Sequence, residues 1–305
     1  LSDKVSKSAW DLDSKSSFAD VLLYHYYFIY STDKPSRYFQ LLWEKINNKY
    51  FVERASHKIN YESTFKVSVD KFSNYNIYTD EGNDLGVLTF NFYNSDINFL
   101  TSNENFKISQ PNFKFYPDFN VIEGSDGLIS SYINNEQLDK VEFVLNRFNI
   151  DLETGKITSN ETKFNSKKFT NILGVFDYLP PKNLGGPANK FSFISNESNI
   201  DFTFQNNIRI RMGLALEGDN LLTKSLEGKD SEIIFRLNNG KKIIINSHAF
   251  KLDKANISSP SSYFKITHNS DSLYHPLVEF NYNKITNSIE ILNLEGPLKN
   301  TSFYS

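Results

Sequence analysis

The hexapeptide Asp271–Pro276 (DSLYHP) gathers residue types that could carry out nucleophilic catalysis. Asp271, Ser272 and His275 supply the acid, hydroxyl and imidazole of a hydrolytic triad. Triads are assembled from distant segments, however, and no GxSxG elbow is present to offer a nucleophilic serine. The hexapeptide instead predicts a turn between two strands, with Pro276 opening the second strand at an edge. We expect no catalytic residue, and we retain Asp271, Tyr274 and His275 as candidates for a structural turn or an interaction site.

The histidines and cysteines predict no metal site. No two histidines have the i, i+4 spacing of a helical zinc site, and no HExxH motif occurs. The chain contains no cysteine, which excludes disulfides, thiolate ligands and cysteine nucleophiles. The glycine-containing turns lack the Lys–Ser/Thr pair of a phosphate loop. We therefore expect neither a metal nor a cofactor.

Charged and aromatic side chains leave two binding hypotheses open. Arg209 and Arg211 alternate on one predicted strand and could bind an anion or an acidic partner, although such residues more often form a solvated face. The many carboxylates could include a glycosidase pair, and aromatic side chains on sheet faces suit a sugar platform.

Composition limits the class of protein. The 305 residues carry 33 basic and 36 acidic side chains, and this balance does not favour nucleic-acid binding. The 27 Phe and 17 Tyr, with little Ala, favour sheet over helix. The longest apolar run, Val21–Tyr30, is shorter than the roughly 20 residues that span a membrane, so we expect no membrane span in this segment.

The first sixty residues have a helical pattern. Ser17 and Asp20 resemble a helix-capping pair, and apolar residues recur after them at three- and four-residue spacing. Pro35 suits the first turn of a second helix, whose apolar face extends to Tyr50. The prediction is a helical N-terminal unit, an αα-hairpin, over residues 1–61.

The period changes to two after Tyr61, which is typical of strands with one buried face. Ile208–Leu216 is the clearest case, and the alternation around Phe148 continues that of the preceding residues in a shifted register. Asn239–Gly240 predicts a hairpin turn. We find no repeat with a fixed period.

The Pro/Gly-rich segment 180–190 suits neither a helix nor a central strand. It predicts a junction between two β-rich regions, 62–179 and 191–305. The fold class expected is mainly β, with antiparallel sheets in a sandwich-like arrangement or an elongated groove or solenoid. With the helical hairpin the chain is α+β overall.

Two stretches, Phe148–Gly186 and Lys251–Asn283, resemble pieces of large, mostly uncharacterised β-rich cell-envelope proteins of AT-rich Gram-negative bacteria. In that family a DSxYHP hexapeptide introduces a strand, and the matching residues here are Asp271, Ser272 and Tyr274–Pro276. The resemblance implies an exported protein of the periplasm, outer-membrane-associated or at the cell surface. It carries over no active-site residue.

These observations favour a non-enzymatic scaffold or protein-interaction component of the bacterial cell envelope. The expected partners are other envelope proteins or further segments of its own parent chain. An alternative is a carbohydrate-binding or carbohydrate-active module, and a second alternative is a β-groove that carries lipid on faces rich in Phe, Ile and Leu.

Overall fold

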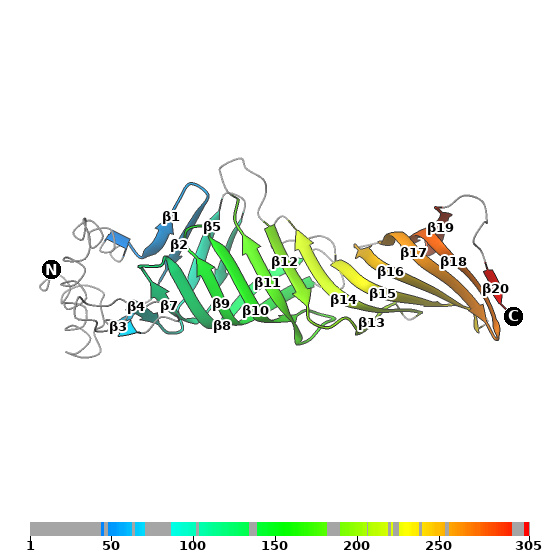
Figure 1. Cartoon of the computed structure of the whole chain (residues 1–305), viewed down its shortest axis with the longest axis horizontal. Helices are drawn as coiled ribbons and strands as arrows, with labels where there is room; N and C mark the ends of the chain where they lie inside the picture. The colour runs from blue at the N-terminus through cyan, green and yellow to red at the C-terminus, as the bar shows by residue number, and fades with distance from the viewer. Residues whose placement is uncertain are drawn as a thin grey trace, which may run out of the picture. The chain divides into compact units, whose positions relative to one another are not determined.

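The computed structural model describes residues 44–45, 48–62, 65–70, 87–101, 104–133, 139–181, 190–205, 207–218, 221, 226–237, 240–253, 256–294 and 302–304. Most of these residues lie in antiparallel β-strands, which confirms the expectation of a mainly antiparallel β protein (Figure 1). The helical hairpin expected before Tyr50 lies outside the described residues, apart from Glu44 and Lys45. Residues 50–61, assigned to the helical unit from the sequence, form two strands and a turn instead.

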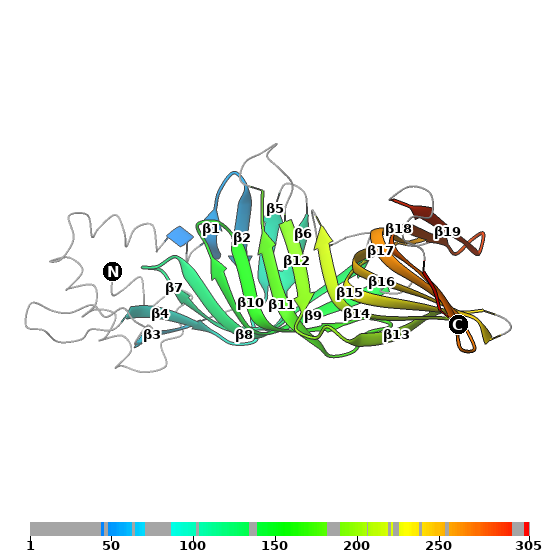
Figure 2. The same ribbon diagram turned by 45° about the vertical axis from the view of Figure 1, so that its right-hand side comes forward.

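A small sheet of four strands lies near the start of the described chain. Its order is β1 (Tyr50–Glu53), β2 (His57–Tyr61), β5 (Ile97–Thr101) and β6 (Asn105–Ile108). Figure 2 shows these blue and teal strands as a layer of their own beside the larger sheet. Phe51 of β1 packs against Phe113 and Phe115, with ring centroids 5.8 and 5.0 Å apart. Burial of these aromatic faces is the main force that joins the two layers.

The larger sheet contains the remaining strands. They are β3 (Lys66–Asp70), β4 (Val87–Phe92), β7 (Asn112–Tyr116), β8 (Val121–Ile133), β9 (Asp139–Asp151), β10 (Lys156–Asn165), β11 (Ile172–Leu179), β12 (Lys190–Ser195), β13 (Ile200–Gln205), β14 (Ile208–Gly218), β15 (Leu226–Arg236), β16 (Lys242–Leu252), β17 (Asn256–His268), β18 (Asp271–Asn283), β19 (Ser288–Asn293) and β20 (Ser302–Tyr304). Neighbouring strands follow the chain order almost throughout, except that β7 pairs with β4, β12 pairs with β14, and β20 pairs with β18.

The chain divides into two compact units and passes between them several times, the last time at residues 189–190, at the end of the Pro/Gly-rich segment. Unit 1 comprises residues 1–129, 144–161 and 177–189, and unit 2 comprises residues 130–143, 162–176 and 190–305. The strands β8 to β11 therefore each contribute residues to both units. The Pro/Gly-rich segment follows the end of β11 at Leu179 and precedes β12 at Lys190, as its composition predicts.

The sheet of unit 2 bends so that strands distant in the sheet touch through their inner faces. Phe235 of β15 lies 5.7 Å from Phe280 and 5.3 Å from Tyr282, both on β18. The strands β16 and β17 stand between these two in the sheet. The Tyr282 hydroxyl also donates a hydrogen bond of 2.7 Å to Gln205 Oε1 on β13. The core of unit 2 is thus enclosed by one bent sheet.

The buried positions of β15 to β18 change phase at one level of the sheet. Inward-facing residues normally alternate with outward-facing ones, but here two successive buried residues are three apart in the chain. Register shifts accompany this change between β14 and β15 and between β17 and β18. We call the inserted residues the unit-2 shift row: Lys229–Asp230, His248–Ala249, Pro260–Ser261 and Pro276–Leu277.

Local chemistry suits these insertions. Asp230 has a positive φ of 47°, a conformation that Asp tolerates better than branched residues do. Pro260 and Pro276 cannot donate a ladder hydrogen bond, and bulged positions are where proline is accepted within a sheet. Pro276 therefore lies inside β18 and does not open the strand, contrary to the sequence-based expectation.

The strands β8 to β10 carry a unit-1 shift row of the same kind: Ser125–Asp126, Asn146–Arg147 and Asn160–Glu161. Asp126 has a positive φ of 60°, and Asp230 in the unit-2 shift row also has a positive φ. The change in the alternation around Phe148, which is visible in the sequence, corresponds to the inserted residues Asn146–Arg147 within the single strand β9.

The two rows belong to an internal sequence similarity. Residues 122–129 (IEGSDGLI) match 226–233 (LEGKDSEI), and residues 156–164 (KITSNETKF) match 256–264 (NISSPSSYF). Between these pairs, Phe148 corresponds to Phe250. The separation falls from 104 residues at Gly124 to 102 at Phe148 and 100 at Ser159, because the connecting turns differ in length. The three strands β8 to β10 and the three strands β15 to β17 are thus a repeated motif without a fixed period.

Candidate functional site

The residues of the hexapeptide lie along one strand. A tight turn at Asn269–Ser270 precedes Asp271, which pairs with His268 across it. The Ser270 hydroxyl lies 3.4 Å from Asp271 Oδ1 and can donate a weak hydrogen bond to it. Asp271 and His275 are four residues apart in extended chain, so their backbones are separated by about 13 Å. The structure does not bring them together as an acid–imidazole pair.

Tyr274 and His275 face different surroundings. The Tyr274 ring stacks on Tyr263 of β17 with centroids 5.3 Å apart. His275 is 8% exposed, and its Nδ1 accepts a hydrogen bond of 3.3 Å from the Leu277 amide. Its Nε2 is buried and has no hydrogen-bond partner in the part of the chain that the structure describes. An imidazole enclosed in this way is not accessible to a substrate.

Arg209 and Arg211 lie on the exposed face of β14 and pair with carboxylates of their own chain. Arg209 donates two hydrogen bonds to Asp201 of β13, one of them from Nε at 2.8 Å. Arg211 lies 3.8 Å from Asp201 and 3.8 Å from Glu232 of β15. The hydrogen bond from Arg209 holds the pKa of Asp201 below its ordinary value. These pairs favour the interpretation as a solvated face, because both cations already have anionic partners.

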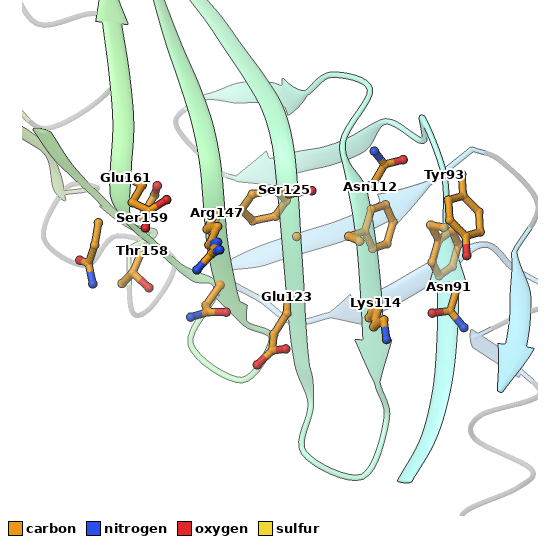
Figure 3. A pocket seen from close by; sticks show the side chains of 16 residues that line it. Asn91, Tyr93, Asn112, Lys114, Glu123, Ser125, Arg147, Thr158, Ser159 and Glu161 are labelled. Carbon is orange, nitrogen blue, oxygen red and sulfur yellow. The ribbon is translucent and has the colours of Figure 1, made fainter. Parts of the chain in front are cut away.

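A depression in unit 1, which we call the unit-1 depression, brings together residues that sequence reasoning did not single out. It has a volume of about 600 Å³ and is lined by residues of β4, β7, β8, β9 and β10 with their adjoining positions. Figure 3 shows labelled side chains in sheet order, from Asn91 and Tyr93 through Lys114, Glu123 and Arg147 to Glu161. The unit-1 shift row crosses this site, so the side chains that line it come from the strands at their irregular positions.

Most of the residues that line the unit-1 depression are polar, although Phe92, Phe113 and Phe148 also contribute. The amides Asn91, Asn112, Asn149 and Asn160, the hydroxyls Ser125, Thr158 and Ser159, and the charged residues Lys114, Glu123, Arg147 and Glu161 all contribute. Two cations and two carboxylates leave the lining without net charge. Tyr93, which is 59% exposed, offers an aromatic surface at one side.

Several of these polar side chains have no internal partner. Among the described residues, Glu123, Arg147, Asn149, Asn160 and Glu161 take part in no side-chain hydrogen bond or ion pair. Their donors and acceptors therefore remain available to water or to a ligand. The sheet beneath them fixes their spacing, which reduces the entropy lost on binding.

The unit-2 depression, of about 490 Å³, lies on the other shift row. Its lining includes Asp230, Glu232, Ser247, His248 and Tyr263. Here several polar groups are paired: His248 Nδ1 lies 3.2 Å from Asp230, and Ser247 shares a hydrogen bond of 2.7 Å with Ser259. The hydroxyls of Ser231 and Ser262 are buried without a partner among the described residues. The repeated motif thus produces two depressions that differ in how far their polar groups are satisfied.

No group of three or more metal-ligating side chains occurs among the residues whose placement is described. Over the same residues, no helix has the length and apolar character needed to cross a lipid bilayer. Neither observation assigns a role.

No protein-family model matches the chain, and neither a curated protein nor a solved structure is found to be similar to it. Inference about function therefore depends on the geometry described above.

Proposed function

We propose that the chain is a non-catalytic β-sheet scaffold of the bacterial cell envelope that binds extended segments of other envelope proteins. The envelope location comes from the resemblance of the C-terminal half to envelope proteins. The binding mode follows from the edge strands of the described part of the chain, whose outer amide and carbonyl groups can accept a further strand.

The edge strand β19 is the observation that carries this proposal. In the described part of the chain β19 pairs with β18 alone, through the register Val278↔Asn293 to Asn283↔Ser288. Leu292 is 60% exposed and Leu294 is 46% exposed beside it. Exposed leucines next to an unpaired strand edge offer both the hydrogen bonds and the apolar contact that a docking strand requires.

A lipid-carrying role is not part of the proposal. The apolar side chains that face inward in unit 2 are packed against one another, as Phe235 is against Phe280 and Tyr282. In unit 1, Phe92 stacks on Phe113 with ring centroids 4.4 Å apart. Acyl chains would have to displace these contacts, which stabilise the fold.

A photo-crosslinking residue at Leu292 tests the proposal in cells of the source organism. The matched control carries the same residue at Leu173, an exposed leucine of β11 in unit 2. We expect a discrete crosslinked protein from position 292 and none from position 173. That protein, once purified, should bind the purified chain, and Leu292→Lys should abolish binding while Leu173→Lys preserves it. Absence of a crosslink specific to position 292, or binding that Leu292→Lys leaves intact, would refute the role of this edge.

A further inference from the structure

The unit-1 depression and the unit-2 depression allow an internal comparison. Both lie on shift rows of the repeated motif, and β8 to β10 in the first correspond to β15 to β17 in the second. The strands β4 and β7 complete the unit-1 depression, and β18 completes the unit-2 depression. In unit 2, His248 pairs with Asp230 and Glu232 pairs with Arg211. In unit 1, Glu123, Arg147 and Glu161 have no such partner among the described residues. The two carboxylates of the unit-2 depression therefore have partners within the chain, whereas the two carboxylates of the unit-1 depression have none among the described residues.

The chemistry of the open site restricts what it can bind. Amide, carboxylate and guanidinium groups can each make two hydrogen bonds to adjacent donors or acceptors on a ligand. The equal numbers of cations and carboxylates give no net attraction for a phosphate or another polyanion. A ligand rich in neutral hydroxyl groups matches this set, because a hydroxyl both donates and accepts.

The shape and position of the site are consistent with a small ligand. Its volume of about 600 Å³ falls within the range of about 300–1,000 Å³ that is common for small-molecule sites. Arg147 lies on β9 between Glu161 of β10 and Glu123 of β8 (Figure 3). Tyr93 on the far side supplies a partly exposed ring against which an apolar face of a sugar can pack.

We propose that the unit-1 depression binds a neutral oligosaccharide through Arg147, Asn149, Asn160 and the two glutamates, with Tyr93 as a packing surface. This site is distinct from the β19 edge and lies in the other unit. The two proposals can therefore fail independently, because Leu292→Lys leaves the lining of the unit-1 depression unchanged.

Isothermal titration of the full chain with neutral trisaccharides tests this inference. Maltotriose, cellotriose, chitotriose and mannotriose serve as probes, with tri-galacturonate and inorganic phosphate as anionic comparisons. We expect at least one neutral trisaccharide to bind with a Kd of about 1 mM or tighter. The anionic probes should bind at least about tenfold more weakly, because their charge would lie near Glu123 and Glu161 in a lining that has no net positive charge.

Variants locate the binding. Arg147→Ala and Asn149→Ala, both at exposed positions, should each weaken binding of that trisaccharide about tenfold. His248→Ala in the unit-2 depression is the matched control and should leave the Kd unchanged. No neutral trisaccharide bound at about 10 mM, preferential binding of the anionic probes, or equal binding by the Arg147 and His248 variants would each overturn the proposal.

Discussion

The ring of Phe148 lies directly over Gly124, so that a Cβ atom added to the glycine would overlap the ring. The same relationship holds in the second copy of the motif, where the ring of Phe250 occupies the space over Gly228. In each copy the glycine comes two residues before an Asp with positive φ, Asp126 or Asp230. Because glycine has no side chain, the aromatic ring of the next strand can pack directly on its backbone beside the shift row. This close approach explains why the motif has glycine here.

Replacement of Gly124 by Ala should destabilise unit 1. The new methyl group would overlap a ring that is 3% exposed and closely packed, so we expect a loss of about 1–3 kcal/mol in the free energy of unfolding. Urea unfolding monitored by circular dichroism measures it. Gly213→Ala is the control, because its nearest neighbours are 3.5 Å or more from the added atom. Phe148→Leu in the Gly124→Ala background should recover part of the loss; a purely additive double variant would contradict this account.

Two buried serines adjacent to the unit-2 shift row should respond to replacement in opposite directions. Ser262 Oγ is buried without a hydrogen-bond partner among the described residues, so Ser262→Ala removes an unsatisfied group and should stabilise by about 1 kcal/mol. Ser247, its neighbour across β16 and β17, exchanges a hydrogen bond of 2.7 Å with Ser259. Ser247→Ala should therefore destabilise by about 1–2 kcal/mol. Thermal unfolding of both variants measures the difference, and a loss of stability in Ser262→Ala would show that the hydroxyl has a partner.

The sequence predicts the long strands well, because the alternation of apolar residues that marks a strand lies within that strand's own segment. The alternation from Ile208 predicts β14, and Asn239–Gly240 lies between the paired strands β15 and β16, with Gly240 at a φ of 77°. Residues up to Tyr50 have helical spacing, yet Tyr50 begins β1, because pairing with β2 outweighs the local periodicity. A short apolar segment does not specify its own partner.

The candidate site could not be predicted in the same way. The unit-1 depression draws on five strands, and its shape depends on how they pair and bend, which no single segment encodes. The shifted register near Phe148 was a visible signal, but its meaning emerged from the matching shifts in neighbouring strands. The internal repeat was missed because the turns differ in length, so that Gly124 and Ser159 have different separations from their counterparts. The repeat is visible in the sequence only when each strand is aligned with its counterpart separately.

Asp118, in the turn between β7 and β8, should make the stability of unit 1 depend on pH. Burial raises the pKa of Asp118 to about 7, from an unfolded value of about 3.9. The folded state then binds the proton more tightly, so stability falls as the pH rises from about 4 through 7. Asp118→Asn removes this loss. We expect the variant to be about 1–2 kcal/mol more stable than the wild type at pH 8 and similar to it at pH 4. The gain at pH 8 is smaller than the full pKa shift implies, because the side chain is only part-buried.

Asp96 provides a comparison of opposite sign. A hydrogen bond of 2.7 Å from Lys107 lowers the pKa of Asp96, so this carboxylate contributes stability above its unfolded pKa and loses it as the pH falls. Asp96→Asn should therefore be less stable than the wild type at pH 8 and should approach it at low pH. Urea midpoints between about pH 2 and pH 8 measure both variants, because the contribution of Asp96 is lost only below its unfolded pKa of about 3.9. If the two variants show the same pH trend, the assignment of the Asp118 shift to burial is wrong.

Arg209 and Arg211 should contribute little to stability despite their prominent alternation in the sequence. Their guanidinium groups are exposed and share Asp201, and ion pairs of this kind are weakened by solvent and by salt. We expect Arg209→Gln and Arg211→Gln to shift the urea midpoint only slightly, and the shift to disappear in about 0.5 M NaCl. Because either arginine can still pair with Asp201 when the other is replaced, the double variant should cost more than the sum of the single variants. A large loss that persists in salt would mean that these arginines stabilise the fold by packing along β14 rather than by charge, since their aliphatic stems can cover apolar surface.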